Sequence, residues 1–244
     1  PNALPSNALT EANKVQPGQA YTSGAAGTFG RATSTVGTTV GIGTYRHDLA
    51  WLGTAGGEYR TGGSIAAYDA KTGKEVWKRH TIPGPGEKGH ETWPNDDSWE
   101  HGGASVWTTG SYDPETNLTF WGIGNPGPDF NSAQREGDNL YSDSVIAIDA
   151  DTGELKWHFQ FTPNDPYDYD STQVPVLADV NWQGRPRKVM MFGNRNGFFY
   201  VLDRTNGAFL QGGAYATVNW ARGLDAKGRP IVTPQPPGKP TFPG

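Results

Sequence analysis

The sequence predicts an all-β fold, and three observations support this class. The chain of 244 residues contains 34 Gly and 19 Pro, and only 34% of its residues are hydrophobic. This composition is typical of many short strands joined by tight turns. One hairpin sequence recurs three times, and the aromatic residues that precede its copies recur at intervals of about 70 residues. Each repeat therefore combines two hairpins, which is the four-stranded blade of a β-propeller.

The order of the elements follows from these repeats. Residues 1–37 are rich in Ala, Gly, Ser, Thr and Pro without a clear hydrophobic period, so we expect an irregular lead-in. Three blades are expected at about 38–80, 104–160 and 172–212. An insertion at 81–103 separates the first two, and loops of that length are often functional lids or rims. The Pro- and Gly-rich residues 213–244 are expected to form a connector.

A closed ring needs more blades than these three. Propellers usually have roughly four to eight blades. We therefore expect the remaining blades to come from a longer parent chain or from other chains.

The recurring hairpin turns at the pattern Asp-x-x-Thr-Gly-x-x-x-Trp. In the first copy a strand ends at Asp69, turns through Thr72 and Gly73, and returns to Trp77. Gly supplies the positive φ of the turn, and the Asp and Thr side chains bond its amides. A second copy spans 149–157, and a looser copy spans 203–207.

A second hairpin precedes each copy and leads to one residue with a polar side chain. The aromatic anchors of the three hairpins are Trp51, Trp121 and Phe192. The polar residues that follow them are, in the same order, Glu58, Asn125 and Arg195, and we expect these to lie at equivalent points on one face of the ring. The oxygens of Glu and Asn suit a hard cation such as calcium, and Arg suits an anionic or quinone-like oxygen. Polar residues also end strands simply because solvent lies there, and the pattern alone leaves both interpretations open.

Trp107 is a candidate stacking surface. It follows the small residues Gly-Gly-Ala-Ser, so its indole could lie flat over the ring axis and face a planar ligand. A core tryptophan packed between blades is the usual alternative, since the chain has nine Trp.

Asp168 and Asp170 are candidate acids for a metal or for proton transfer. Strand alternation would point both side chains the same way. Two such acids either share a proton or hold a metal, and one of them can act as a general base. The alternative is turn capping by Asp, which better explains Asp165 beside Pro166.

Several classes of protein are disfavoured. The formal net charge is −5, and the basic residues are not clustered in the sequence, so nucleic acid is not an expected partner. No apolar run approaches the ~18 residues of a membrane span, and the first residues carry no export signal. The absence of cysteine excludes disulfides within this chain. The five His show no ligand spacing, although His90 and His101 could line a substrate entrance.

Five longer motifs follow one another between Gly53 and Gly212. They are GGEYRTGGSIAAYDAKTGKEVW, GGASVW, YDPETNLTFWGIGNPGP, REGDNLYSDSVIAIDADTGELKWHFQFTPNDPYDYD and NRNGFFYVLDRTNG. In this order they resemble the quinoprotein alcohol dehydrogenases, the methanol and ethanol dehydrogenase family that uses pyrroloquinoline quinone. The resemblance implies an eight-bladed propeller with tryptophan-docking turns and a periplasmic location.

The resemblance also implies the roles of the site residues. Trp107 would be the floor on which the quinone stacks, and Arg195 would contact the quinone oxygens. The remaining cofactor contacts would come from Gly56, Gly57 and Ser105. The metal ligands would be Glu58, Asn125, Asp168 and Asp170.

Two of these acids have further implied features. Asp168 would also be the catalytic base. Asp170 matches the additional acid of the lanthanide-using branch, and a more highly charged ion favours one more carboxylate. The metal is therefore expected to be a lanthanide ion or Ca²⁺, with the lanthanide favoured. Ala104 departs from the family, where glycine is usual.

The implied reaction is the oxidation of a primary alcohol to an aldehyde. A small alcohol is the expected substrate, and a cytochrome c-type protein is the expected electron acceptor. This stretch of chain alone is expected to be inactive, because later blades complete the cofactor site. Two alternatives remain open: a non-catalytic propeller that acts as a scaffold or binding module, and a quinoprotein that acts on a sugar, polyol or polymer alcohol.

Overall fold

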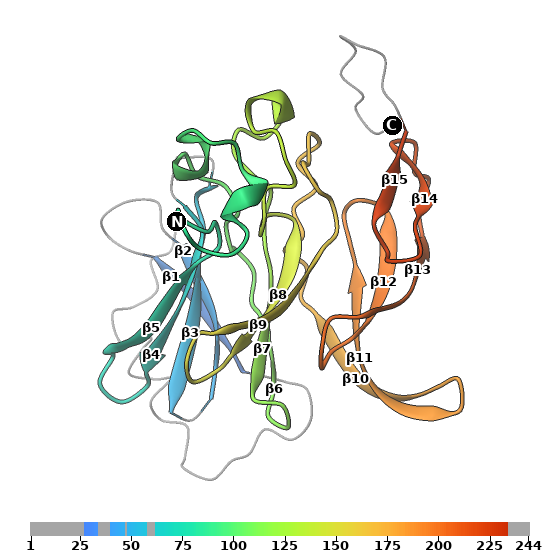
Figure 1. Cartoon of the computed structure of the whole chain (residues 1–244). Helices are drawn as coiled ribbons and strands as arrows, with labels where there is room; N and C mark the ends of the chain where they lie inside the picture. The colour runs from blue at the N-terminus through green and yellow to red at the C-terminus, as the bar shows by residue number, and fades with distance from the viewer. Residues whose placement is uncertain (1–26, 34–39, 47, 58–61, 234–244) are drawn as a thin grey trace.

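The computed structural model describes residues 27–33, 40–46, 48–57 and 62–233, and the description of side chains begins at Arg46. The predicted all-β class is confirmed, because three antiparallel sheets and a final two-stranded hairpin follow one another along the chain (Figure 1). The helical segments in the described part of the chain are the short 3-10 turns His90–Thr92, Ser98–Glu100 and Ser132–Gln134. None of its helices is long and apolar enough to span a bilayer.

The strands pair in the order in which they occur. The first sheet contains β1 (Gly27–Thr33), β2 (Val40–Tyr45), β3 (Leu49–Thr54), β4 (Ser64–Asp69) and β5 (Glu75–His80). The second contains β6 (Ser111–Asp113), β7 (Leu118–Gly122), β8 (Ser144–Asp149) and β9 (Leu155–Gln160). The third contains β10 (Val176–Trp182), β11 (Arg185–Gly193), β12 (Phe198–Asp203) and β13 (Phe209–Ala214). The final hairpin contains β14 (Ala221–Leu224) and β15 (Pro230–Val232).

Strands occur within the predicted irregular lead-in and within the predicted connector. β1 falls within the predicted lead-in 1–37 and adds a fifth strand to the first sheet by pairing with β2. The β14–β15 hairpin falls within the predicted connector 213–244, and its turn is capped by Asp225, which accepts hydrogen bonds from two backbone amides. These strands are rich in small residues or very short, so their sequences show little hydrophobic alternation.

The predicted hairpin turns form as expected. Asp69 Oδ1 accepts hydrogen bonds from the Lys71 and Thr72 amides at 3.0 and 2.7 Å and from the Thr72 hydroxyl at 2.8 Å. Gly73 has a φ of 70°. The turn at Asp149 repeats these contacts with Thr152.

The tryptophan that follows each of the first two turns packs on the turn of the next sheet. A Cβ placed on Gly153 would lie 2.8 Å from the Trp77 ring, and one placed on Gly207 would lie 2.6 Å from the Trp157 ring. The Trp77 indole also donates a hydrogen bond of 3.1 Å to the Ala150 carbonyl. Successive sheets are therefore joined by the same tryptophan-on-glycine contact.

The second sheet is covered on both faces. On one face, Trp121 and Ile146 pack in a cluster with residues of the first sheet such as Trp51. On the opposite face, Phe120 and Val145 pack in a cluster with residues of the third sheet and the chain beyond it. Alternate residues of each strand thus fill the two cores, as stacked blades require.

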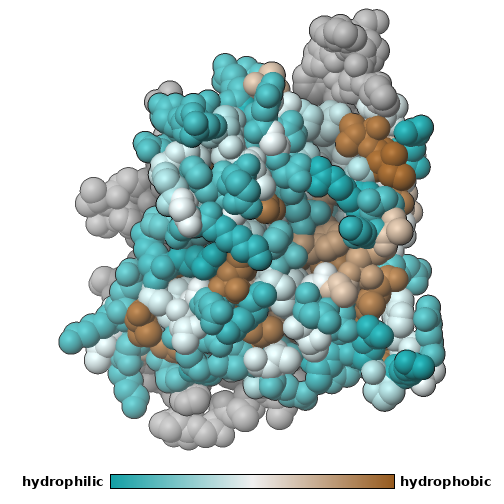
Figure 2. Space-filling view, in the orientation of Figure 1, coloured by the Kyte–Doolittle hydropathy of each residue, from teal (hydrophilic) through white to brown (hydrophobic). Residues whose placement is uncertain are grey.

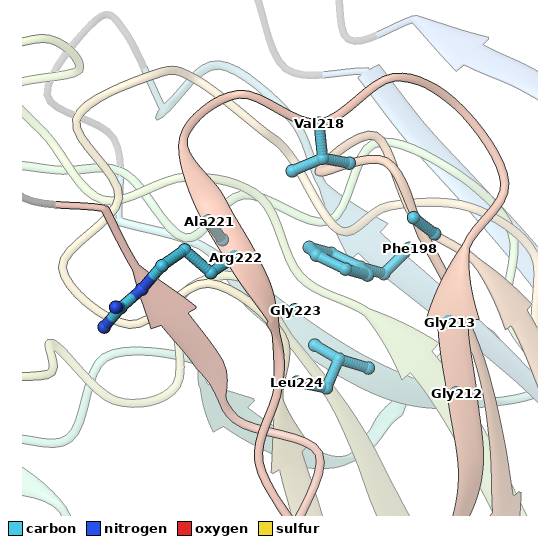
Figure 3. Close-up of a pocket in the computed structure, with 9 residues that line it drawn as sticks. Phe198, Gly212, Gly213, Val218, Ala221, Arg222, Gly223 and Leu224 are labelled. Atoms are coloured by element: carbon cyan, nitrogen blue, oxygen red, sulfur yellow. The ribbon is translucent and has the colours of Figure 1, made fainter.

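The C-terminal hairpin, β14 and β15, carries exposed hydrophobic side chains. Figure 2 shows hydrophobic surface over the C-terminal hairpin, where Ile231 and Val232 are 40% and 52% exposed. A cleft of about 240 Å³ opens between β13 and β14, lined by Phe198, Val218 and Leu224 (Figure 3).

The docking contact predicts a difference between two glycine substitutions. Gly207 and Gly73 have nearly the same φ, 75° and 70°, but a Cβ on Gly73 would meet nothing within 4 Å. Gly207→Ala is therefore expected to cost about 1–3 kcal/mol more stability than Gly73→Ala, because only the former crowds a tryptophan. Thermal unfolding of the two variants of the whole protein measures this difference, and equal shifts would contradict the docking role.

Candidate functional site

An extended segment, residues 103–107, forms the centre of the site. Its backbone lies between the end of β3 and the chain that follows β7. Val106 N donates to Thr54 O at 2.8 Å, and Ala104 N donates to Asn125 O at 2.6 Å. Ser105 O accepts a hydrogen bond from Gly124 N at 2.8 Å. These bonds bring the chain that follows the aromatic anchor Trp51 and the chain that follows Trp121 together along residues 103–107.

Glycine allows the close approach of this segment to the chain after β3. A Cβ on Gly57 would lie 3.1 Å from Gly103 Cα and 3.3 Å from Ser105 Cβ. Gly56 has a φ of 100°, which disfavours other residues. Ala104 has a φ of 48°, so this alanine stands in a conformation that suits glycine better.

Asp170 connects three of the predicted site residues. Its Oδ1 accepts hydrogen bonds from the Asn125 backbone amide at 3.1 Å and from the Trp107 indole at 3.4 Å. Its Oδ2 forms an ion pair with Arg195 Nη1 at 3.0 Å. Because the Asp170 side chain is only 9% exposed, little solvent competes for these contacts.

Trp107 differs from the other tryptophans. It is 38% exposed, whereas the other eight are buried or half-buried. The indole edge is fixed by Asp170, and part of the ring surface remains open. It can therefore offer a stacking surface in a way that the docking and core tryptophans cannot.

Asn125 is almost fully buried, at 3% exposure. Its Nδ2 donates to Asp129 Oδ1 at 2.7 Å, which leaves the carboxamide oxygen as the acceptor end. A carboxamide oxygen of this kind is a suitable ligand for a hard cation.

Asp168 lies in an irregular loop, so the expected strand alternation with Asp170 is wrong. No strand spans residues 161–175, and Asp168 has a φ of 62°. The Asp165 carboxylate accepts hydrogen bonds from the Tyr167 and Tyr169 amides at 2.8 and 2.5 Å. The backbone on both sides of Asp168 is therefore held by a buried acid that caps the turn.

Asp143 is a buried acid that the sequence analysis did not identify. It is fully buried, and within the described part of the chain neither carboxylate oxygen has a hydrogen-bond partner. Burial raises the pKa of Asp143 well above its usual range, and the charges of Asp165 and Asp170 raise it further, while Arg135 opposes the shift. Only its position just before β8 in a polar run, Ser-Asp-Ser, marks it in the sequence.

Asp165 has a related electrostatic environment. Burial raises its pKa to about 7, against the lowering effect of the hydrogen bonds from the Tyr169 and Tyr167 amides. Asp168 is a further neighbouring charge of both buried acids. This part of the structure thus gathers more carboxyl groups than cations, as a site for a multivalent cation would.

The predicted residues are only partly brought together within the described ranges. The contacts above link Gly57, Ser105, Trp107, Asn125, Asp170 and Arg195. Glu58 lies outside the described residues, and no group of three or more His, Asp or Glu side chains inside them is arranged to hold a metal ion. The cleft between β13 and β14 shares no residue with this site.

The two candidate histidines have contacts inside the insertion. His90 Nδ1 is 3.0 Å from Pro83 O, and His101 Nε2 is 3.1 Å from Asp97 Oδ2. The insertion itself is joined to the loop before β8, because Trp93 Nε1 donates to Leu140 O at 2.6 Å.

Comparison with known proteins gives a consistent family. The family model described as "Glucose/ethanol/alcohol dehydrogenase, beta-propeller domain" (PQQ) matches residues 31–218. Quinohemoprotein alcohol dehydrogenase ADH IIB of Pseudomonas putida is 44% identical over 197 residues, which cover 75% of this chain and 28% of that protein. The chain thus spans less than a third of the length of this relative.

Two solved structures are also similar. The quinohemoprotein alcohol dehydrogenase of Comamonas testosteroni has a TM-score of 0.76 and 39% identity, over 81% of this chain and 32% of that one. A europium-containing methanol dehydrogenase has a TM-score of 0.73 and 33% identity, over 78% of this chain and 36% of that one.

Proposed function

This chain belongs to the family of glucose, ethanol and alcohol dehydrogenase β-propeller domains, and from that premise we propose that it is part of a quinoprotein alcohol dehydrogenase. The whole protein oxidises a primary alcohol to an aldehyde with pyrroloquinoline quinone and a bound metal ion. The three sheets belong to blades of an eight-bladed ring, at about 38–80, 104–160 and 172–212. The first sheet also includes β1, which precedes these limits.

The hydrogen bonds and ion pair of Asp170 carry this proposal. One buried carboxylate holds an indole, an amide and a guanidinium that come from separate segments of the chain. An aromatic surface, a hard-oxygen ligand and a cation are the groups that a planar quinone with a coordinated metal requires.

The residues present fit both groups. The open face of Trp107 and the glycine approach at Gly57 suit a flat ligand. The excess of carboxyl groups suits a multivalent cation, and it includes Asp143, whose oxygens have no hydrogen-bond partner among the described residues. The described carboxylates alone do not form a metal site, so Glu58 is needed to complete it. Asn125, Asp168, Asp170 and Glu58 are the proposed metal ligands, and Gly56, Gly57, Ser105, Trp107 and Arg195 are the proposed quinone contacts.

Asp168 is the proposed general base. When bound, the metal and quinone supply a Lewis acid and a two-electron acceptor. Asp168 takes the proton of the alcohol hydroxyl, so that the oxygen can form a carbonyl as its carbon is oxidised. Arg195 supplies positive charge beside the quinone oxygens, and Asp170 fixes the orientation of this guanidinium.

The metal, the acceptor and the compartment are part of the same proposal. One similar structure is a europium-containing enzyme, and Asp170 adds a carboxylate, so the metal is a lanthanide ion or Ca²⁺. Electrons leave to a cytochrome c-type acceptor, since similar proteins are quinohemoproteins. The periplasm is the proposed location.

Reconstitution tests the proposed reaction. The whole protein, freed of metal and quinone, is incubated with pyrroloquinoline quinone and either Ca²⁺ or a light lanthanide. We expect reduction of a dye acceptor that depends on a primary alcohol and on both additions. A protein that binds the quinone and metal but oxidises no primary alcohol would contradict the proposal.

A further inference from the structure

Arg135 is a fully buried guanidinium close to the proposed site. It lies in the long loop between β7 and β8, directly after a 3-10 turn. Burial lowers the pKa of Arg135, while the charges of Asp165, Asp143 and Asp129 oppose this shift. A buried arginine is costly to desolvate, so its hydrogen bonds must compensate.

One set of these bonds holds the loop that carries Asn125. Arg135 Nε donates to Pro128 O at 3.1 Å, and Nη2 donates to Asp129 O at 2.9 Å. The Asp129 side chain in turn accepts the hydrogen bond from Asn125 Nδ2 at 2.7 Å. The guanidinium is thus two contacts away from the carboxamide of the proposed metal ligand.

A second set holds the loop that carries Asp168. Arg135 Nη2 also donates to the Asp165 backbone carbonyl, and the Arg135 carbonyl accepts a hydrogen bond from Asn164 Nδ2 at 2.8 Å. Asp165 holds the amides of Tyr167 and Tyr169 on either side of Asp168. The position of Asp168 and its φ of 62° therefore depend on backbone that Arg135 fixes.

We propose that Arg135, acting through Asp165, is a positioning residue that sets the separation between Asn125 and Asp168. This inference rests on the proposed function of these two residues. A guanidinium suits the task because its rigid, planar set of donors can bond carbonyls of two loops at once, whereas a lysine has a single ammonium on a flexible stem. Side chains that orient metal ligands usually act in this way.

Arg135→Lys and Arg135→Met in the whole protein test the inference. We expect Ca²⁺ affinity of the quinone-loaded protein, measured by calorimetry, to fall by about 10- to 100-fold. We expect kcat to fall by as much as about 100-fold, because small misplacement of a reacting group is costly. KM for the alcohol should change little. Hydrogen exchange of the peptide 163–172 should become faster even before cofactor is added.

Arg204 provides a matched control. It is a buried arginine, 5% exposed, that pairs with Asp113 and Asp179. It follows β12, whereas Arg195 precedes that strand, so it lies at the opposite end of the sheet. Arg204→Met is expected to lower the melting temperature without changing Ca²⁺ affinity. Equal losses of Ca²⁺ affinity in the Arg135 and Arg204 variants would show a merely structural role and overturn the inference.

Asp165 provides a second test that keeps Arg135 intact. Asp165→Asn retains one carbonyl oxygen that can accept an amide hydrogen bond, whereas Asp165→Ala retains none. We expect Asn to preserve more of kcat and Ca²⁺ affinity than Ala. If both Arg135 variants fail to fold, the Asp165→Asn and Asp165→Ala variants decide the test. Equal kcat and equal Ca²⁺ affinity in these two variants would overturn the inference.

Failure of this inference differs from failure of the proposed function. If Asp168→Asn is inactive while Arg135→Lys keeps normal kcat and Ca²⁺ affinity, only the positioning role is wrong. If Asp168→Asn keeps normal activity, the proposed site is wrong and the positioning role falls with it.

Discussion

Asp168→Asn is expected to abolish alcohol oxidation while the protein stays folded. The carboxamide cannot accept the hydroxyl proton, and loss of a general base typically costs about 10²- to 10⁴-fold in rate. The side chain is half-buried in an irregular loop whose backbone is held by Asp165, so its replacement leaves the packed sheets unchanged. Steady-state kinetics of the reconstituted whole protein measure the effect.

Asp225→Asn is the control for this substitution. Asp225 also lies in a loop, but it caps the turn between β14 and β15, where its carboxylate accepts hydrogen bonds from the Lys227 and Arg229 amides, and neither of these residues belongs to the site. We expect its variant to keep normal kcat. Undiminished activity of Asp168→Asn would remove Asp168 as the base.

Asp170→Asn is expected to impair lanthanide-supported activity more than calcium-supported activity. The variant keeps an oxygen that can accept the hydrogen bonds of the Asn125 amide and the Trp107 indole, but it removes the negative charge. Loss of this charge weakens the electrostatic attraction for a trivalent ion more than for a divalent ion. We expect the lanthanide-supported rate to fall by about 10- to 100-fold or more. Removal of a hydrogen-bond partner of a metal ligand typically causes a loss of about 10- to 100-fold.

Asp170→Ala separates charge from anchoring. It removes the acceptor as well, so Trp107 and Arg195 both lose their contact. Calcium-supported activity should then fall further than in Asp170→Asn. Equal losses with the two metals in Asp170→Asn would refute the assignment of Asp170 as the acid that selects a lanthanide.

The hairpins could be predicted because a few residues that are adjacent in the sequence determine each turn. The turn at Asp69 needs only an acid, a hydroxyl and a glycine within five positions, and its repetition at Asp149 shows the period. The docking of Trp77 on Gly153 was expected only from the resemblance to the quinoprotein family, and it joins two successive copies of this turn. Asn125 and Arg195 follow the aromatic anchors of successive predicted blades, and both contact the Asp170 carboxylate, as their equivalent positions in the repeat led us to expect.

The rest of the site depends on loops, where residue spacing carries less information. Asp168 and Asp170 do not follow strand alternation, because the positive φ of Asp168 breaks it. Arg135 and Asp143 lie in segments without repeats, and only tertiary contacts reveal that they are buried. A charged residue in a polar loop looks solvent-exposed in the sequence, so neither could be identified from composition or period.

Anomalous diffraction from crystals of the whole protein, loaded with pyrroloquinoline quinone and a lanthanide, tests the central claim most directly. The account predicts one strong peak at about 2.3–2.6 Å from oxygens of Asn125 and Asp168, as for oxygen ligands of a hard cation, with the quinone stacked on Trp107. A peak remote from these side chains, or a Trp107 indole covered by protein on both faces, would contradict it.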